Sequence, residues 1–277
     1  MALYAFDGTW NEDEPGISKD TNVVKFRSAY PENLQRVYMN GPGTRFGWLG
    51  KAIGGLTGLG ARSRIKQAKK ALTERFAAGD TDIDIIGFSR GAALALHFAN
   101  VVNEERNGAT VRFLGLWDVV ASFGLPGNPF NIGWTLSLPP NVERCAHAMA
   151  LDERRGNFPL ERVLKPDRSA DFRRVEEVWF RGVHSDVGGG NGNTGLSDFA
   201  LRWMLSKAKE AGAPVSYKGE FKPDPTAKIS KNKDLIADPW RVVMPTDFVH
   251  ESVEPRAGYN ELPPDLRRAR DDAGLPA

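Results

Sequence analysis

A glycine–x–serine–x–glycine pentapeptide is the segment of this sequence with the clearest chemical meaning. It reads Gly87-Phe88-Ser89-Arg90-Gly91, follows an apolar run that starts at Ile83, and leads into a segment rich in alanine and leucine. Such a pentapeptide between a strand and a helix is typical of a nucleophile elbow, a sharp turn that exposes the serine hydroxyl. Its glycines leave room for the helix to pack beside the strand. The pattern therefore predicts Ser89 as a catalytic nucleophile.

A serine hydroxyl is a weak nucleophile, so it needs an adjacent base and a carboxylate that orients the base. The sequence contains four histidines. His97 lies two turns into the predicted elbow helix and His147 lies in a helix-like pattern, so both are interpreted as structural. His184 stands where a predicted strand ends in a glycine-rich loop, which is where open α/β sheets place functional residues. His184 is therefore the favoured base, and His250, after another short predicted strand, is the alternative.

Two aspartates are candidates for the orienting acid. Asp118 ends the predicted strand that follows the elbow helix. Asp186 is close to His184 in sequence, but a carboxylate two residues away more often caps a local turn than orients a ring. The order Ser89, Asp118, His184 reproduces the nucleophile–acid–base order of α/β hydrolases. Asp118 is therefore the favoured acid and Asp186 the alternative.

The first predicted strand, at residues 2–6, supplies the candidates for stabilising an oxyanion. It ends in a turn that contains Gly8 and Thr9. α/β hydrolases often place a second oxyanion donor in such a turn, next to the N–H that follows the nucleophile. The predicted oxyanion hole therefore combines the backbone N–H of Arg90 with that of Gly8 or Thr9.

The same turn has a second interpretation, a phosphatase of the haloacid-dehalogenase type with Asp7 as its nucleophile. That motif is usually Asp-x-Asp-Gly-Thr. Here Ala5 takes the place of the first aspartate, so one of the two catalytic carboxylates is missing. The phosphatase is the weaker alternative.

Strand patterns alternate with helix patterns along the chain, which predicts a mostly parallel sheet with helices on both faces. The expected fold is an α/β-hydrolase-like domain over residues 1–277, since no linker divides the chain. Strands are predicted at 2–6, 35–39, 83–86, 110–117 and 175–180, and helices at 22–26, 62–78, 90–102, 145–158 and 195–211. From about residue 213 the chain is a polar, proline-rich extension.

The segment 121–140 is apolar, rich in proline and glycine, and without a clear period. It is predicted to form a cap or lid. Phe123, Phe130 and Trp134 are its candidate substrate-binding residues, because burying an acyl chain yields about 0.8 kcal/mol per CH₂. A loop that simply packs on the core is the alternative.

The composition limits the other functions. A net charge of +2 does not favour nucleic acid as a partner, and the one cysteine excludes an internal disulfide. No signal peptide and no apolar run of transmembrane length is visible. We therefore expect a protein that is cytoplasmic where it is made. Export without a cleaved signal and peripheral contact with a membrane both remain possible outcomes of this sequence. The proposed chemistry needs no metal and no organic cofactor.

Several of these motifs together resemble the DUF2235 family of α/β hydrolases, which includes the Tle1-type phospholipase effectors of bacterial type VI secretion. The matching stretches are Phe6–Asn11, Asn22–Val24, Gly87–Ala92, Leu114–Ser122, Leu151–Arg155, Gly182–Gly190 and His250–Val253. The resemblance implies a catalytic triad on Ser89, Asp118 and His184 and hydrolysis of lipid or other esters. The function predicted is a serine esterase or lipase, with a non-catalytic binding module on the same fold as the alternative.

Overall fold

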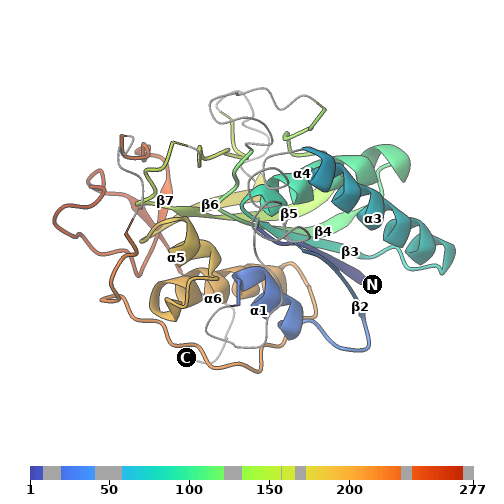
Figure 1. Ribbon diagram of the computed structural model, residues 1–277, viewed down its shortest axis with the longest axis horizontal. Helices are drawn as coiled ribbons and strands as arrows, with labels where there is room; N and C mark the ends of the chain where they lie inside the picture. The colour runs from blue at the N-terminus through green and yellow to red at the C-terminus, as the bar shows by residue number, and fades with distance from the viewer. Residues whose placement is uncertain are drawn as a thin grey trace.

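The computed structural model describes residues 1–8, 20–40, 58–121, 133–156, 158–165, 173–231 and 239–270. These residues form an eight-stranded sheet in the order β2-β1-β3-β4-β5-β6-β7-β8, and every pairing is parallel (Figure 1). The strands are β1 (Ala2–Phe6), β2 (Gln35–Met39), β3 (Ile83–Phe88), β4 (Val111–Trp117), β5 (Val142–Ala150), β6 (Val175–Phe180), β7 (Phe248–His250) and β8 (Arg267–Ala269). The described helices are α1 (Asn22–Ala29), α3 (Gly58–Ala77), α4 (Arg90–Glu105), α5 (His184–Gly188) and α6 (Thr194–Glu210). The predicted α/β-hydrolase-like class is confirmed.

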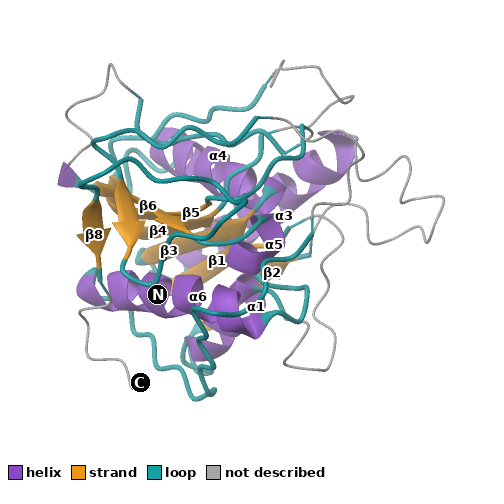
Figure 2. Ribbon diagram, turned by 90° about the vertical axis from the view of Figure 1, so that its left-hand side faces the viewer, coloured by secondary structure: helices purple, strands orange, loops and turns teal. Residues whose placement is uncertain are grey.

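Helices cover both faces of the sheet. Helices α3 and α4 lie on one face, and α1 and α6 lie on the other, as Figure 2 also shows. Strand β1 is buried on both sides, so its alternate side chains enter two different hydrophobic clusters. Tyr4 and Phe6 pack against Phe98 of α4, with ring centroids 5.0 and 5.6 Å apart, whereas Leu3 and Ala5 face the α1–α6 side.

Two glycines let the turn between β3 and α4 form against β1. A Cβ atom on Gly87 would lie 2.6 Å from the Gly91 carbonyl oxygen, and one on Gly91 would lie 2.3 Å from the Phe6 carbonyl oxygen. Both obstacles are backbone atoms, which cannot turn away as a side chain can. The glycines of the pentapeptide are therefore required by the close contact of α4 with β1 and β3.

We expect Gly91→Ala to lower the unfolding temperature by roughly 5–10 °C, because overpacking costs about 1–3 kcal/mol and each kcal/mol shifts a domain of this size by about 2–4 °C. Thermal unfolding followed by circular dichroism measures the effect. Gly79→Ala is the matched control, since its added methyl group meets no atom within 4 Å and only its positive φ of 76° opposes the change. An equal loss in both variants would contradict the close-contact argument.

One predicted helix is wrong. Residues 145–158 were expected to be a helix and its exit, but Val142–Ala150 is β5, paired with β4 and β6 at the centre of the sheet. Its alanines favour a helix locally, yet pairing on both sides and burial decide the conformation of a central strand. His147 is consequently a fully buried strand residue that contacts Glu177, with 2.9 Å between His147 Nδ1 and Glu177 Oε1.

The polar C-terminal region contributes more to the sheet than its composition indicates. Strands β7 and β8 extend the sheet beyond β6. Most of the predicted lid lies outside the described residues, and residues 133–140 contain neither helix nor strand. The lid and the extent of the domain therefore stay predictions.

Candidate active site

The strand order reverses at β1, because the chain passes from β1 to β2 on one side and then crosses to β3 on the other. In open α/β sheets ligands bind beyond the carboxyl ends of the strands at such a reversal. Ser89 directly follows β3, Asp118 directly follows β4, and His184 begins α5 shortly after β6. Since all strands are parallel, these three residues lie at the same edge of the sheet.

Ser89 occupies a strained turn. Its φ is 59° and its ψ is −128°, in a region that residues other than glycine rarely adopt. Its amide donates to the Trp117 carbonyl over 3.0 Å, and its carbonyl accepts from the Val120 amide over 3.2 Å. These bonds fasten the turn to the loop that carries Asp118. Strain of this kind costs about 1–3 kcal/mol and concentrates at functional sites.

Asp118 and His184 form a buried hydrogen-bonded pair. His184 Nδ1 lies 2.6 Å from Asp118 Oδ2, and both residues are at most 5% exposed. A carboxylate only accepts hydrogen bonds, so Nδ1 carries the proton and Nε2 remains an acceptor. The imidazole packs on the ring of Phe88, at 4.6 Å between centroids, and Phe88 directly precedes Ser89. The structure therefore brings the favoured acid and base together beside the turn that carries Ser89.

Arg241 completes this cluster, and the sequence analysis missed it. Its Nη1 donates to Asp118 Oδ1 over 2.6 Å and its Nη2 to Asp118 Oδ2 over 3.2 Å. The same guanidinium also donates to the carbonyls of Ala150 and Phe158. Asp118 Oδ1 accepts a further bond from the Ala150 amide over 2.8 Å. No local motif marks an arginine that is distant in sequence and reaches the site only through the fold.

The surroundings lower the pKa of both Asp118 and His184. Burial alone would raise the pKa of Asp118, but Arg241 and the His184 hydrogen bond hold that pKa well below its usual range. Burial lowers the pKa of His184 below 6.5, although Asp118 opposes the shift. The ground state at neutral pH is therefore an ionised carboxylate with a neutral imidazole.

Glu153, itself paired with Arg155, holds the backbone of His184. Its amide donates to Glu153 Oε2 over 3.1 Å, and Glu153 forms a bidentate ion pair with Arg155. The Arg155 guanidinium stacks on the ring of Phe158, 3.8 Å from its centroid, and Phe158 meets the imidazole edge-on at 4.8 Å. Burial raises the pKa of Glu153, but the Arg155 bonds outweigh it and lower the pKa, so the anchor is an anion.

The alternative base and acid have other partners. His250 Nδ1 lies 2.7 Å from the Ser252 hydroxyl, and its ring stacks on Phe180 at 4.7 Å. Asp186 is fully buried and accepts hydrogen bonds from Ser230, from Asn191 and Asn193, and from the Val183 amide. Among the hydrogen bonds of the described residues, Asp118 and not Asp186 is the aspartate that contacts His184.

The structure describes two of the three predicted oxyanion donors, and the surroundings of the two amides differ. Arg90 is the first residue of α4, so its amide lies at a helix N-terminus beside Ser89. The Gly8 amide donates to Asp7 Oδ1 over 2.7 Å, and it can serve an oxyanion only by sharing or leaving that bond. Thr9 lies outside the described residues.

Asp7 has the environment of a structural carboxylate. It is buried and accepts bonds from the hydroxyls of Tyr38 and Thr21 over 2.6 and 2.7 Å. Burial raises its pKa to about 6 despite these donors. With its oxygens occupied and Ala5 in place of a second carboxylate, it lacks what a phosphatase nucleophile requires.

Of the three candidate substrate-binding aromatics, the structure describes Trp134. Phe123 and Phe130 lie outside the described residues. Trp134 meets His97 edge-on at 4.9 Å. His97 is seven residues into α4, or about 10 Å along the helix from its start, so Trp134 packs on the flank of α4. In the described part of the chain no group of three or more His, Cys, Asp or Glu residues is placed to hold a metal ion.

An all-parallel sheet of this order, with a strained serine turn after β3, defines an α/β hydrolase. The family described as "T6SS, Phospholipase effector Tle1-like, catalytic domain" matches residues 3–105 and 100–207. The chain belongs to this family. No match is found among the curated proteins. None of the described helices is both long and apolar enough to cross a membrane.

A solved structure with a TM-score above 0.5 shares the fold. A crystal structure of an uncharacterized protein from Pseudomonas aeruginosa is 23% identical, with a TM-score of 0.57, and the match covers 80% of this chain and 47% of that one. The chain thus spans about half the length of that protein. ClbQ from the colibactin NRPS/PKS pathway is 10% identical, with 76% and 98% covered and a TM-score of 0.42. RedJ, a thioesterase from the prodiginine biosynthetic pathway in Streptomyces coelicolor, is 15% identical, with 69% and 85% covered and a TM-score of 0.37.

Proposed function

We propose that the protein is a serine hydrolase that cleaves carboxylic esters through a triad of Ser89, His184 and Asp118. The observation that carries the proposal is the 2.6 Å hydrogen bond between Asp118 and His184, buried beside the strained turn of Ser89. The Asp118 carboxylate holds the imidazole so that Nε2 is available as the base. Membership of a phospholipase effector family supports the same chemistry.

The proposed reaction has two halves. Ser89 Oγ attacks the ester carbonyl carbon while its proton passes to His184 Nε2, and a tetrahedral oxyanion forms. The imidazolium then gives that proton to the leaving alcohol, the ester C–O bond breaks, and an acyl-enzyme remains. Water repeats the sequence on the acyl-enzyme, which releases the acid and regenerates Ser89. Asp118 stabilises the imidazolium in both halves and stays ionised throughout.

The oxyanion is proposed to accept hydrogen bonds from the Arg90 amide and from one amide of Gly8 or Thr9. Losing one such donor typically costs about 3–4 kcal/mol of barrier. The Gly8 amide would then exchange its bond to Asp7 for a bond to the oxyanion.

The proposed substrates are lipid esters, as the family description indicates. The protein would act as a secreted bacterial effector, with peripheral membrane contact at its target. Substrate binding by the segment 121–140, with Phe123, Phe130 and Trp134, belongs to the same proposal.

Covalent labelling with a fluorophosphonate probe tests the proposal directly. We expect stoichiometric labelling, with the added mass on the peptide that contains Ser89, because only an activated serine attacks phosphorus rapidly. Heat-unfolded protein is the control and should not react. Folded protein that stays unlabelled would favour the binding module without catalytic activity.

The rate should fall on acidification through a pKa below 6.5, because the base must be neutral and burial lowers the pKa of His184. Arg241→Met removes a positive charge that also lowers this pKa. The acid limb of kcat/KM should therefore move to higher pH in the variant. A pH profile of p-nitrophenyl butyrate hydrolysis, recorded for the wild type and for Arg241→Met, measures the acid limb of each protein.

Arg241→Lys is the matched control for this prediction. It keeps the charge but loses the two-pronged contact with Asp118, so its acid limb should stay near that of the wild type. An unmoved limb in Arg241→Met would show that the charge of Arg241 does not lower the pKa of His184.

A further inference from the structure

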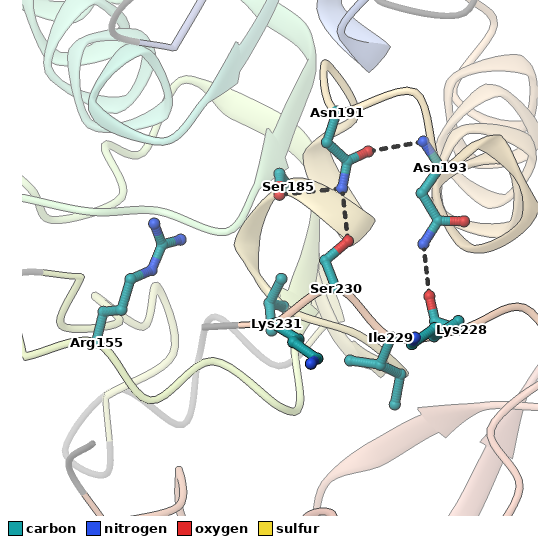
Figure 3. Close-up of a pocket in the computed structure, with 9 residues that line it drawn as sticks. Arg155, Ser185, Asn191, Asn193, Lys228, Ile229, Ser230 and Lys231 are labelled. Carbon is teal, nitrogen blue, oxygen red and sulfur yellow. Dashed lines mark hydrogen bonds between the residues drawn. The ribbon is translucent and has the colours of Figure 1, made fainter. Parts of the chain in front are cut away.

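A pocket of about 680 Å³ opens beside the start of α5, the helix that begins with His184 (Figure 3). Val183 and Ser185, the two neighbours of His184 in sequence, both line it. Arg155 lines it as well, and the same guanidinium stacks on Phe158, whose ring meets the His184 imidazole. Neither Ser89 nor His184 lines the pocket, but the lining includes both sequence neighbours of His184 and contacts its ring through Phe158.

Basic side chains line the pocket. Its lining includes Arg155, Lys228 and Lys231 and no aspartate or glutamate. Glu153 pairs with Nε and Nη2 of Arg155 and leaves Nη1 outside that ion pair. Lys228 and Lys231 are exposed, and no ion pair to either is formed by the described residues. A ligand in this pocket would thus meet two lysines that form no ion pair with a residue in the described ranges.

Asp186 fixes the segment that carries the lysines. Ser230, which lies between Ile229 and Lys231, donates to Asp186 through both its amide and its hydroxyl, over 2.9 and 2.6 Å. Asn193 bridges Asp186 and the Lys228 carbonyl over 3.0 and 2.9 Å. Figure 3 shows the bond from Asn193 to the Lys228 carbonyl, together with a bond from the Asn191 amide group to the Ser230 hydroxyl. The buried carboxylate thereby holds the backbone of both lysines against α5.

We propose that this pocket binds the phosphodiester group of the lipid substrate while the ester lies at Ser89, an inference that rests on the proposed function. Phosphate oxygens are strong acceptors, and lysine ammonium groups bind them as point charges. The phosphate is assigned to the substrate because the pocket lining contacts the residues around His184. A site for an unrelated phosphate would not need to lie beside the proposed base. The pocket would then favour phospholipids over neutral glycerides.

Binding to the Ser89→Ala protein tests the subsite without turnover. Isothermal titration would compare dihexanoylphosphatidylglycerol with dihexanoylglycerol, each as a monomer below its micelle concentration. We expect the phospholipid to bind about tenfold more tightly, with that preference weakened by added NaCl, as exposed ion pairs are. The double substitution Lys228→Met/Lys231→Met should remove most of the preference.

Lys66→Met/Lys70→Met is the matched control, because both lysines are exposed on α3 and neither lines the pocket. It should keep the tenfold preference. Equal binding of the two lipids, or a preference that survives the Lys228/Lys231 substitution, would overturn the proposal. Inorganic phosphate that binds as tightly as the phospholipid, with the same dependence on the lysines, would also overturn it by indicating a site for free phosphate.

The proposed function is tested separately by p-nitrophenyl butyrate turnover in the wild-type protein. Failure of that turnover alongside intact phospholipid preference would refute the catalytic triad and not the pocket. Turnover with no effect of the lysines on lipid binding would refute the pocket and not the triad.

Discussion

Ser89→Ala should reduce ester hydrolysis by about 10⁴- to 10⁶-fold, the range found when a triad nucleophile is removed. Alanine has no hydroxyl to attack the ester carbonyl, and nothing in its side chain can replace Ser89 Oγ as the nucleophile. Hydrolysis of p-nitrophenyl butyrate, with the fluorophosphonate reaction in parallel, measures the loss. Turnover close to that of the wild type would end the elbow hypothesis.

The fold of Ser89→Ala should survive, which makes the loss interpretable. The Ser89 side chain makes no capping hydrogen bond to α4, and alanine meets the same backbone strain at a φ of 59°. We therefore expect the unfolding temperature to stay within a few degrees of the wild type, since substitutions without such a partner usually change stability by less than about 1 kcal/mol. A large drop would mean that the hydroxyl has a structural role.

His184→Ala should lose activity about as completely as the serine variant, because members of a triad act as a unit. Without the imidazole no group accepts the Ser89 proton, and Asp118 keeps its ion pair with Arg241. The double variant Ser89→Ala/His184→Ala should be no worse than either single variant. Kinetics of the two single variants and the double variant measure this non-additivity.

His250→Ala is the informative comparison, since it removes the alternative base. His250 bonds to Ser252 and stacks on Phe180, so its loss should lower stability while most of the activity remains below the unfolding transition. Unfolding temperature and kcat/KM should therefore respond separately. If His250→Ala is inactive and His184→Ala is active, the assignment of the base is wrong.

Local sequence determined the nucleophile turn and most of the elements around it. The pentapeptide works as a signal because two glycines are required within a few residues of each other, by contacts of 2.6 Å and 2.3 Å with the backbone. Strands β1, β2, β3, β4 and β6 and helices α1, α3, α4 and α6 carry short-range apolar patterns, and the structure confirms them. The sequence also limited the choice of base to four histidines.

Only the tertiary structure decided which side chains meet. His184 and Asp118 are 66 residues apart, and their order along the chain favoured them as base and acid without showing that they meet. Arg241 lies 123 residues from Asp118, and no pattern in the sequence pointed to it. Strand β5 was mistaken for a helix because its partners on both sides, β4 and β6, determine its conformation. Asp186 was open as an acid until the fold placed Ser230, Asn191 and Asn193 around it. Long-range pairing, which depends on the whole chain closing into one sheet, is the physical reason that these assignments needed the structure.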